Sequence, residues 1–334
     1  MRTLVGLVMA GLVALAAAQA FAPRDTPPLA ATRLAVDKMH LNTIATSSAG
    51  LLAGGELGHI LISRDQGKSW QPVGMSHDRQ ALINQIVFDK DGLTGMAVGH
   101  EGWILGTRDG GLTWNELQFQ EKNGEPLMSA ARLPSGRWIA VGAFGRAIKS
   151  DNEGKDWTTL DIPGAQIDDK HLNRIVGSTD GQHWLIVGER GLVLRSDNQG
   201  QDWTTVPAFY NGSFYNALPL TKGGWLVYGM RGNAYVNHGD ANWTQAAIPA
   251  PVAFFGHAVL PDGRVLLVGQ GGMLATSTDQ GATFSLTRLK GRASLTDIAA
   301  LPDGTAWISS DAGMQMHPTT TPPETAKVST GVAQ

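Results

Sequence analysis

An eight-residue pattern recurs along the 334-residue chain and constrains its fold more than any other feature. It consists of Ser or Thr, then Asp or Asn two residues later, Gly two residues after that, and an aromatic residue at the end. Five complete copies and one degenerate copy end at Trp70, Trp114, Trp157, Trp203, Trp243 and Phe284. The intervals between these aromatic residues are 44, 43, 46, 40 and 41 residues. A period near forty, filled with short apolar runs, is typical of a β-propeller or a comparable repeat array.

Every position of the pattern has a structural role. The Asp or Asn side chain can accept hydrogen bonds from backbone N–H groups just ahead of it, and the Gly can take positive φ. The aromatic residue then begins the next strand and offers a large surface for burial. The pattern therefore predicts a tight connection between two antiparallel strands, and no catalytic role is needed to explain it. The predicted structural acceptors are Asp65, Asp109, Asn152, Asn198 and Asp279.

These octapeptides resemble the Asp-box, or BNR repeat, S-x-D-x-G-x-[ST]-W, of sialidases and many non-enzymatic propellers. The three Asp copies match it, the two Asn copies are close substitutes, and His238 of the degenerate copy departs from it. In those families the Asp-box lies on the outer rim, away from the ligand face. The resemblance thus implies a fold and does not imply an active site.

A second repeated element, Gly-x-x-Gly between two apolar strands, sets the number of units. Six copies span 55–58, 99–102, 142–145, 188–191, 229–232 and 269–272, and a seventh has Ser310 and Gly313 at the glycine positions. Two residues between such positions predict a β-hairpin turn. Seven turns in step with the Asp-boxes predict an all-β fold, a seven-bladed β-propeller over residues 32–317.

The ends of the repeat array predict how the ring closes. The seventh unit stops after Met316 without an Asp-box, so it lacks an outer strand, whereas residues 32–37 form an unassigned strand-like segment. We expect this N-terminal strand to complete the last blade, which removes exposed sheet edges. A Pro-rich lead-in covers residues 21–31. Residues 318–334 are polar and Pro-rich, and they predict a disordered tail.

Residues 1–20 are predicted to be an export signal. Arg2 supplies the positive start, 4–17 the apolar run, and 18–20 the small-x-small cleavage pattern. The alternative, a membrane anchor, is disfavoured because the apolar run is shorter than the roughly 20 residues of a spanning helix. We expect signal cleavage, a periplasmic mature chain and no direct membrane insertion after cleavage.

Composition excludes several classes of function. The chain contains no cysteine, which excludes disulfides, thiol catalysis and cysteine zinc sites. The formal net charge of −3, without a basic run, gives no basis for nucleic-acid binding. The nine histidines show no metal-ligand spacing, and H-E-x-x-H, P-loop and G-x-S-x-G motifs do not occur. No catalytic residue, metal or cofactor is predicted.

Alignment of the units suggests a ring of polar side chains at one mouth of the central channel. Its predicted members are Asn42, Asn84, Ser129, Asn173, Asn216, His257 and Thr296. These side chains could contact a ligand or ordered water. They could equally satisfy backbone groups of the loops that lead into the innermost strands, which is the commoner use.

The loops that lead into the innermost strands and the Gly-x-x-Gly turns should share one face, where propellers usually bind. Candidate binding residues there are His100, Glu101, Phe144, Glu189, Arg190, Tyr210, Tyr215, Arg231, Phe254 and Phe255. Exposed aromatic residues beside charges suit a protein-binding surface. Alternatively, these rings pack between blades or plug the channel. Arg190 and Arg231 could clamp a carboxylate or could be solvated turn residues.

The combined pattern V-G-x-x-G-x-[IL]-x-x-[ST]-x-[DN]-x-G-x-x-W resembles that of the photosystem II stability/assembly factor family, over roughly residues 32–316. Residues 98–114, 141–157 and 187–203 follow it closely, and 268–284 nearly so. The resemblance implies an exported, chaperone-like propeller that binds an integral-membrane subunit during assembly and does no catalysis. In a non-photosynthetic bacterium, the partner would be another envelope or transport complex.

Two functions therefore remain in view. The first is a non-catalytic exported propeller that binds and helps assemble or stabilise a membrane protein complex. The alternative is an Asp-box glycoside hydrolase of sialidase type, or a glycan-binding lectin. The sialidase pattern requires an N-terminal Arg-Ile-Pro, which the sequence does not contain.

Overall fold

The computed structural model describes residues 1–22, 35–122, 124–221, 223–239 and 242–319. The chain divides into two units, residues 1–34 and 35–334. The first unit contains one helix, α1 (Arg2–Ala20), with an apolar window of 18 residues that is long enough to cross a membrane, so the expectation that the apolar run is too short to span one requires correction. Such a helix near the N-terminus is compatible with a signal peptide.

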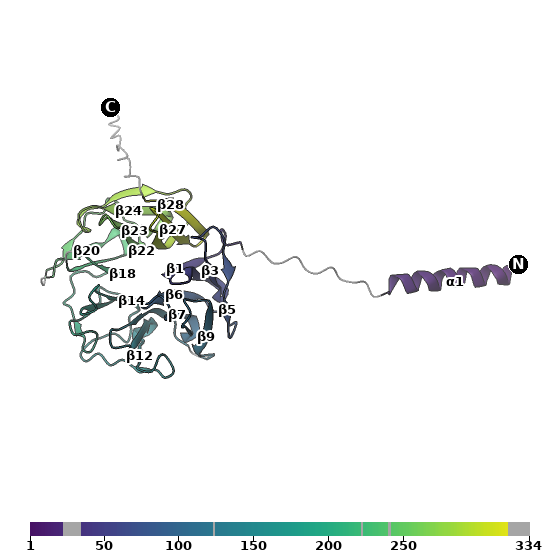
Figure 1. Cartoon of the computed structure of the whole chain (residues 1–334), viewed down its shortest axis with the longest axis horizontal. Helices are drawn as coiled ribbons and strands as arrows, with labels where there is room; N and C mark the ends of the chain where they lie inside the picture. Colours follow the sequence, from purple (N-terminus) through teal and green to yellow (C-terminus); the bar gives the residue numbers. More distant parts are fainter. Residues whose placement is uncertain (23–34, 123, 222, 240–241, 320–334) are drawn as a thin grey trace, which may run out of the picture. The chain divides into compact units, whose positions relative to one another are not determined.

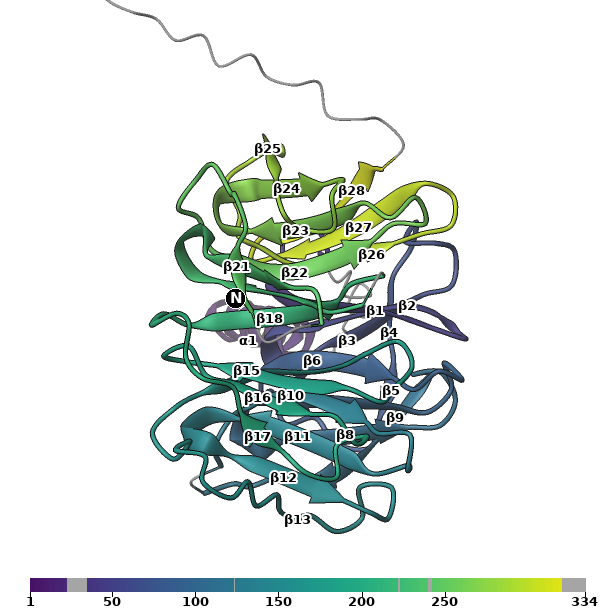
Figure 2. The same cartoon turned by 90° about the vertical axis from the view of Figure 1, so that its left-hand side faces the viewer.

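The second unit is a seven-bladed β-propeller, as the repeats predict. Its described residues form seven sheets around a common centre (Figure 1). The strands labelled nearest to the centre are β1 (Leu41–Ser47), β6 (Ile83–Phe88), β14 (Leu172–Gly177), β18 (Phe214–Pro219) and β22 (Phe254–Val259). In the side view of Figure 2, the sheets that contain β12 (Ala147–Ser150), β16 (Val193–Ser196), β18 and β23 (Val265–Gly269) lie in sequence order from the bottom of the picture to the top. In each blade the chain runs from the innermost strand outward, except that β5 (Gly74–Met75) precedes β6 and pairs in parallel with β9 (Thr113–Gln118) at the outer edge of blade two.

The strands of the seven blades have the following bounds. Blade one contains β1 (Leu41–Ser47), β2 (Gly50–Gly55), β3 (Ile60–Ser63) and β4 (Gln71–Pro72). Blade two contains β5 (Gly74–Met75), β6 (Ile83–Phe88), β7 (Gly95–Gly99), β8 (Ile104–Thr107) and β9 (Thr113–Gln118). Blade three contains β10 (Leu127–Arg132), β11 (Trp138–Gly142), β12 (Ala147–Ser150) and β13 (Thr158–Thr159). Blade four contains β14 (Leu172–Gly177), β15 (Trp184–Gly188), β16 (Val193–Ser196) and β17 (Thr204–Thr205).

The remaining blades repeat this order. Blade five contains β18 (Phe214–Pro219), β19 (Trp225–Gly229), β20 (Ala234–Asn237) and β21 (Thr244–Gln245). Blade six contains β22 (Phe254–Val259), β23 (Val265–Gly269), β24 (Met273–Ser277) and β25 (Ser285–Arg288). Blade seven contains β26 (Leu295–Ala300), β27 (Thr305–Ser310) and β28 (Gly313–Pro318). Five Gly-x-x-Gly turns contain short 3₁₀ segments, η1 (Glu56–Gly58), η2 (His100–Gly102), η3 (Ala143–Gly145), η4 (Met230–Gly232) and η5 (Gln270–Gly272).

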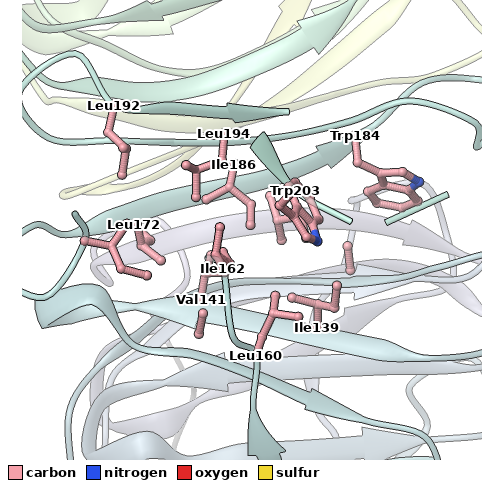
Figure 3. Close-up of a cluster of buried hydrophobic side chains, with 14 of the residues drawn as sticks. Ile139, Val141, Leu160, Ile162, Leu172, Trp184, Ile186, Leu192, Leu194 and Trp203 are labelled. Atoms are coloured by element: carbon pink, nitrogen blue, oxygen red, sulfur yellow. The ribbon is translucent and has the colours of Figure 1, made fainter. Parts of the chain in front are cut away.

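The second strand of each blade forms the centre of the core. All five residues of β7, β11, β15, β19 and β23 are buried, because these strands are covered by neighbouring blades on both faces. A continuous short apolar run is the sequence signal of such a strand. Figure 3 shows one interblade core, in which Ile139 and Val141 of blade three meet Ile186 and Leu194 of blade four. The buried Trp203 side chain, from the Asp-box of blade four, packs in the same cluster.

The Asp-box is the turn between the third and fourth strands, as predicted. In the first copy, Ser63 Oγ accepts the Gly67 N–H at 2.6 Å, and Asp65 Oδ1 accepts the Ser69 N–H at 2.9 Å. The Trp70 indole donates to the Gly67 carbonyl at 3.1 Å. In all five complete copies, the leading Ser or Thr hydroxyl accepts the glycine N–H, a contact that the sequence pattern did not predict.

The Asp and Asn versions of the box both make a side-chain hydrogen bond between this residue and the residue four positions on, but the donor and the acceptor are exchanged. In the Asp copies a hydroxyl four residues on, such as that of Ser69, donates to the carboxylate at 2.6 Å. In the Asn copies the amide donates instead to an Asp four residues on, over 2.7 Å from Asn152 to Asp156 and 2.8 Å from Asn198 to Asp202. Each box therefore keeps one carboxylate and one donor, which explains why Asn is tolerated.

The predicted closure by an N-terminal strand requires correction. Residues 32–34 lie outside the described residues, and the described Ala35–His40 segment is a turn instead of a strand. Blade seven has three described strands, and β28 continues to Pro318, past the predicted end at Met316.

Side chains join blade seven to blade one instead. Thr296 Oγ1 donates to the Leu41 carbonyl at 2.6 Å, and Asp297 Oδ2 accepts the Ile44 N–H at 3.2 Å. Farther out, the Trp307 indole donates to the backbone carbonyl of Gln66 at 2.8 Å. These contacts hold the first and last blades together without an added strand in the described part of the chain.

Candidate functional site

The Gly-x-x-Gly turns and the loops leading into the innermost strands lie on the same face, as predicted. Each turn donates a backbone N–H to the loop of its own blade; for example, Glu56 N bonds to the His40 carbonyl and Glu189 N to the His171 carbonyl. We call this surface the turn face. The Asp-boxes lie at the opposite ends of the third strands, so they belong to the other face.

In six of the seven turns on the turn face, the residue before the second glycine is in the left-handed conformation. The five non-glycine examples have φ between 51° and 56° and exposed side chains: Leu57, Glu101, Phe144, Arg190 and Arg231. The glycine that follows also has positive φ, and at Gly191 an added Cβ would lie 1.8 Å from the Tyr210 carbonyl oxygen. The turn thus requires its second glycine and leaves the preceding side chain free to vary.

Phe144, His171 and Glu189 form a connected group between blades three and four. The Phe144 ring meets the His171 ring edge to face at 5.0 Å and is 60% exposed. The Phe144 N–H donates to His171 Nδ1 at 3.2 Å, which assigns the ring proton to Nε2. Glu189 Oε2 accepts the His171 N–H at 2.9 Å. The repeat pattern indicated Phe144 and Glu189 separately and carried no signal for the histidine that joins them.

The two candidate arginines have different surroundings. Arg190 forms an exposed ion pair with Asp169, and its guanidinium holds the pKa of that carboxyl below its usual range. Arg231 is exposed, and the described residues offer it no ion pair or side-chain hydrogen bond. Burial raises the pKa of Tyr210, and the nearby Arg231 charge opposes that effect. Of the two candidate arginines, Arg231 is therefore the one whose guanidinium is available to a ligand.

The aromatic candidates divide into core and surface residues. Phe254 is fully buried and belongs to an interblade core, so it packs between blades and is not part of an exposed binding surface. Tyr210 is half-buried and packs against Phe214, with ring centroids 5.3 Å apart. Tyr215 and Phe255 are half-buried and adjacent, with centroids 5.4 Å apart. On the blade-two turn, Glu101 is exposed and His100 half-buried.

Strand register corrects the predicted polar ring. The residues opposite the first glycine of each turn are Leu41, Ile83, Leu127, Leu172, Phe214, Phe254 and Leu295. The next residues, which we call the mouth ring, are Asn42, Asn84, Met128, Asn173, Tyr215, Phe255 and Thr296. Ser129 and Asn216 lie one position deeper than predicted, and His257 two positions deeper. The mouth ring thus has polar side chains in blades one, two, four and seven, and a methionine or an aromatic residue in blades three, five and six.

The polar members of the mouth ring bind the neighbouring blade. Asn42 Nδ2 donates to the Ile83 carbonyl at 3.1 Å, and Asn84 Nδ2 to the Leu127 carbonyl at 2.8 Å. Asn173 makes the same contact with the Phe214 carbonyl at 2.7 Å. These amides satisfy backbone groups, as the structural alternative expected, although the groups belong to the next innermost strand.

A deeper inner ring follows, which sequence analysis missed. It consists of Thr43, Gln85, Ser129, Arg174, Asn216, Gly256 and Asp297. Four members accept a backbone N–H from the next blade: Thr43 from Ile86, Gln85 from Ala130, Ser129 from Ile175, and Asp297 from Ile44. The pattern becomes apparent only when the innermost strands are aligned by their pairing with the second strands. Alignment of the sequence repeats alone does not show it.

Comparison with known proteins identifies the family. The sequence model described as photosynthesis system II assembly factor YCF48 matches residues 62–321. The chain belongs to this family. A search of curated proteins finds no match.

Solved structures share the fold of this family member at low sequence identity. A structure of YCF48 bound to a D1 peptide is 19% identical, with a TM-score of 0.67, over 89% of this chain and 99% of that one. YCF48 from Cyanidioschyzon merolae is 17% identical, with a TM-score of 0.67, over 85% and 96%. A GH74 xyloglucanase from Xanthomonas campestris is 14% identical, with a TM-score of 0.68, over 86% and 54%. The fold is thus common to assembly factors and an enzyme.

Proposed function

We propose that this family member is a non-catalytic protein whose turn face holds a segment of a membrane protein subunit while the complex is assembled or stabilised. The partner class follows from YCF48, of which one solved structure contains a D1 peptide. In an organism without photosystem II, the corresponding partner is a subunit of another envelope or transport complex.

The proposal places the mature protein in the periplasm. The apolar helix α1 is compatible with a signal peptide, and we expect cleavage after Ala20 to release the propeller. Within the described residues, no second helix is long and apolar enough to cross a membrane. The partner would be bound through a segment that it exposes on the periplasmic side.

The observation that carries the proposal is the exposed ring of Phe144 at a left-handed turn position. Left-handed backbone costs a residue with a β-carbon roughly 1–2 kcal/mol, and an exposed ring recovers little of this through burial. His171 nevertheless holds Phe144 in place by a ring contact and a backbone hydrogen bond. A fixed, exposed aromatic side chain is suited to act as an anchor in a partner's pocket or against its apolar side chains.

Other side chains of the turn face, in blades five and six, define the chemistry of the partner. Arg231 offers an exposed guanidinium, while Tyr215 and Phe255 place two adjacent aromatic rings at the channel mouth. Aromatic residues and arginine are enriched at protein interfaces. We therefore expect an extended peptide segment that places apolar side chains on these rings and a carboxylate on Arg231.

A glycan-active role is the second candidate, since a xyloglucanase shares the fold. Two of the polar side chains that could handle a sugar are already engaged in protein contacts. Glu189 accepts the His171 N–H, and Arg190 pairs with Asp169. Turnover of a fluorogenic glycoside panel by the purified chain would favour this candidate over the peptide-binding role.

The test is capture of membrane proteins by the tagged mature chain after mild cross-linking in solubilised membranes. A double variant, Phe144→Ser with Arg231→Ser, removes the exposed ring and the free cation. Gln66→Ala is the matched control, because Gln66 is also exposed and left-handed but lies in an Asp-box on the other face. We expect the wild type and the control to capture the same membrane subunit and the double variant to lose it. Equal capture by all three, or capture of none, would overturn the proposal.

A further inference from the structure

A cavity of about 770 Å³ opens on the face opposite the turn face. Its outer part is lined by the ends of β6, β10 and β14 and the turns that follow them, with half-buried apolar side chains at Val87, Phe88 and Val176. Its inner part reaches Gln85, Arg174 and His257, which belong to blades two, four and six. The cavity therefore extends into the central channel.

Arg174 is one of three inner-ring members, with Asn216 and Gly256, that do not accept an N–H from the next blade. A guanidinium cannot accept a hydrogen bond, so it cannot bind the N–H of the next blade as Thr43, Gln85 and Ser129 do. That N–H, on Ala217, is instead accepted at 2.9 Å by Asn216 Oδ1 of its own blade. Arg174 is thus not needed for the hydrogen bonding of the ring.

The guanidinium of Arg174 has no hydrogen bond or ion pair with any described residue, although it is partly buried. Asp297 is close enough for its charge to interact with Arg174, but the Asp297 oxygens accept from Ile44 N, Thr43 Oγ1 and Ile298 N. Withdrawing a cation from water is costly unless it is paired and hydrogen-bonded. Arg174 lines the cavity, and its guanidinium N–H groups are therefore available to bind an anion there.

His257 supplies a neutral polar group at the same depth. Burial, together with the Arg174 charge, lowers the pKa of His257 to about 3, so the ring is neutral at pH 7. Its Nδ1 lies 2.8 Å from the hydroxyl of Tyr228, which is fully buried. A buried hydroxyl requires an acceptor, so Tyr228 donates to Nδ1 and the His257 proton lies on Nε2.

We propose that this cavity binds a small organic carboxylate with an apolar body. The carboxylate lies on Arg174, and the body lies against Val87, Phe88 and Val176 near the opening. The cavity volume falls within the roughly 300–1,000 Å³ of small-molecule sites, and its lining combines apolar side chains with polar and charged groups. Lys90 and Arg132 at the opening attract anions, although Arg132 already pairs with Asp89 and Glu153. The site is separate from the turn face and does not depend on the proposed function.

The test measures binding of hexanoate, hexanol and inorganic phosphate to the full mature chain by calorimetry. We expect hexanoate to bind and the other two not to, because the site requires both a negative charge and an apolar body. Arg174→Gln should weaken hexanoate binding by at least about tenfold, as expected for loss of a charged hydrogen-bond partner. Gln fills the equivalent ring position in blade two, so this variant has a local precedent for folding.

Two further variants test whether a change in hexanoate affinity is specific to the cavity. Arg288→Gln removes an exposed arginine from the outer strand of blade six and should leave hexanoate affinity unchanged. Lys90→Glu reverses an exposed charge at the opening and should weaken binding without unfolding the chain. Equal hexanoate affinity in the wild type and Arg174→Gln, binding of phosphate alone, or no binding of hexanoate would each overturn the proposal.

Discussion

The rings of Trp70 in blade one and Trp307 in blade seven meet edge to face, with centroids 6.2 Å apart and planes at 83°. Trp307 also donates its indole N–H to the Gln66 carbonyl in the same Asp-box. An added Cβ on Gly67 would lie 2.1 Å from the Trp307 indole, so this glycine is required for the contact. The last blade is therefore fastened to the Asp-box of the first.

Replacing Trp307 should weaken ring closure. We expect Trp307→Ala to lower the free energy of unfolding by about 2 kcal/mol, less than for a fully buried tryptophan because this side chain is partly exposed. Urea denaturation of the mature chain measures the change. Trp307→Phe keeps an aromatic ring but loses the N–H, and it should give an intermediate loss. An unfolding midpoint that Trp307→Ala leaves unchanged would contradict this account of closure.

The Asp and Asn versions of the Asp-box should be interchangeable as pairs. Asp65→Asn alone places an amide beside the Ser69 hydroxyl and removes the carboxylate, so we expect a lower melting temperature. Adding Ser69→Asp recreates the Asn152–Asp156 arrangement and should restore most of the loss. The measurement is a double-mutant cycle of melting temperatures. Purely additive effects would show that the two positions do not act as a pair.

Acid should remove the contribution of Asp65. Hydrogen bonds from the Ser69 hydroxyl and N–H, and from Ser63, lower the pKa of Asp65 from 3.8 to about 2. A carboxyl whose pKa is lower in the folded state stabilises the protein above its unfolded pKa, and this contribution is lost as the pH falls towards the folded value. The melting-temperature difference between the wild type and Asp65→Asn should thus shrink between pH 5 and pH 2. A difference that stays constant over that range would be inconsistent with the lowered pKa.

Two glycines with similar backbone angles should respond differently to alanine. Gly164 has φ of 75° and no atom within 4 Å of an added Cβ, whereas Gly191 has φ of 71° and the Tyr210 carbonyl oxygen at 1.8 Å. We expect Gly164→Ala to cost about 1 kcal/mol from backbone strain alone, and Gly191→Ala to cost at least about 2 kcal/mol more. Chemical denaturation compares the two variants. Equal losses would mean that the Tyr210 loop can move aside freely.

The sequence was sufficient to predict the blade count, the Asp-box turns and the shared face of loops and turns, because glycine and Asx positions fix backbone geometry locally. It misplaced Ser129, Asn216 and His257, because the loops between the innermost and second strands differ in length from blade to blade. Register depends on pairing with the second strand, which local pattern does not specify. That Arg174 belongs to the inner ring is seen only when the innermost strands of all seven blades are aligned by their pairing with the second strands.

Ring closure was mispredicted for a related reason. An unpaired outer edge in the last blade suggested an added strand, yet Trp307 and Asp297 join the blades through side chains that carry no repeat signature. The role of His171 was also missed, because its contacts with Phe144 and Glu189 join segments that are separate in sequence.

The central claim is that the turn face contacts a membrane protein subunit, and in-cell photo-cross-linking tests it most directly. A photoreactive phenylalanine analogue replaces Phe144 in one strain and Gln66, on the opposite face, in another. We predict that position 144 forms a cross-link to one membrane protein subunit, identified by mass spectrometry, and that position 66 does not. Cross-linking of that subunit from position 66 alone, or of no membrane protein from position 144, would contradict the account.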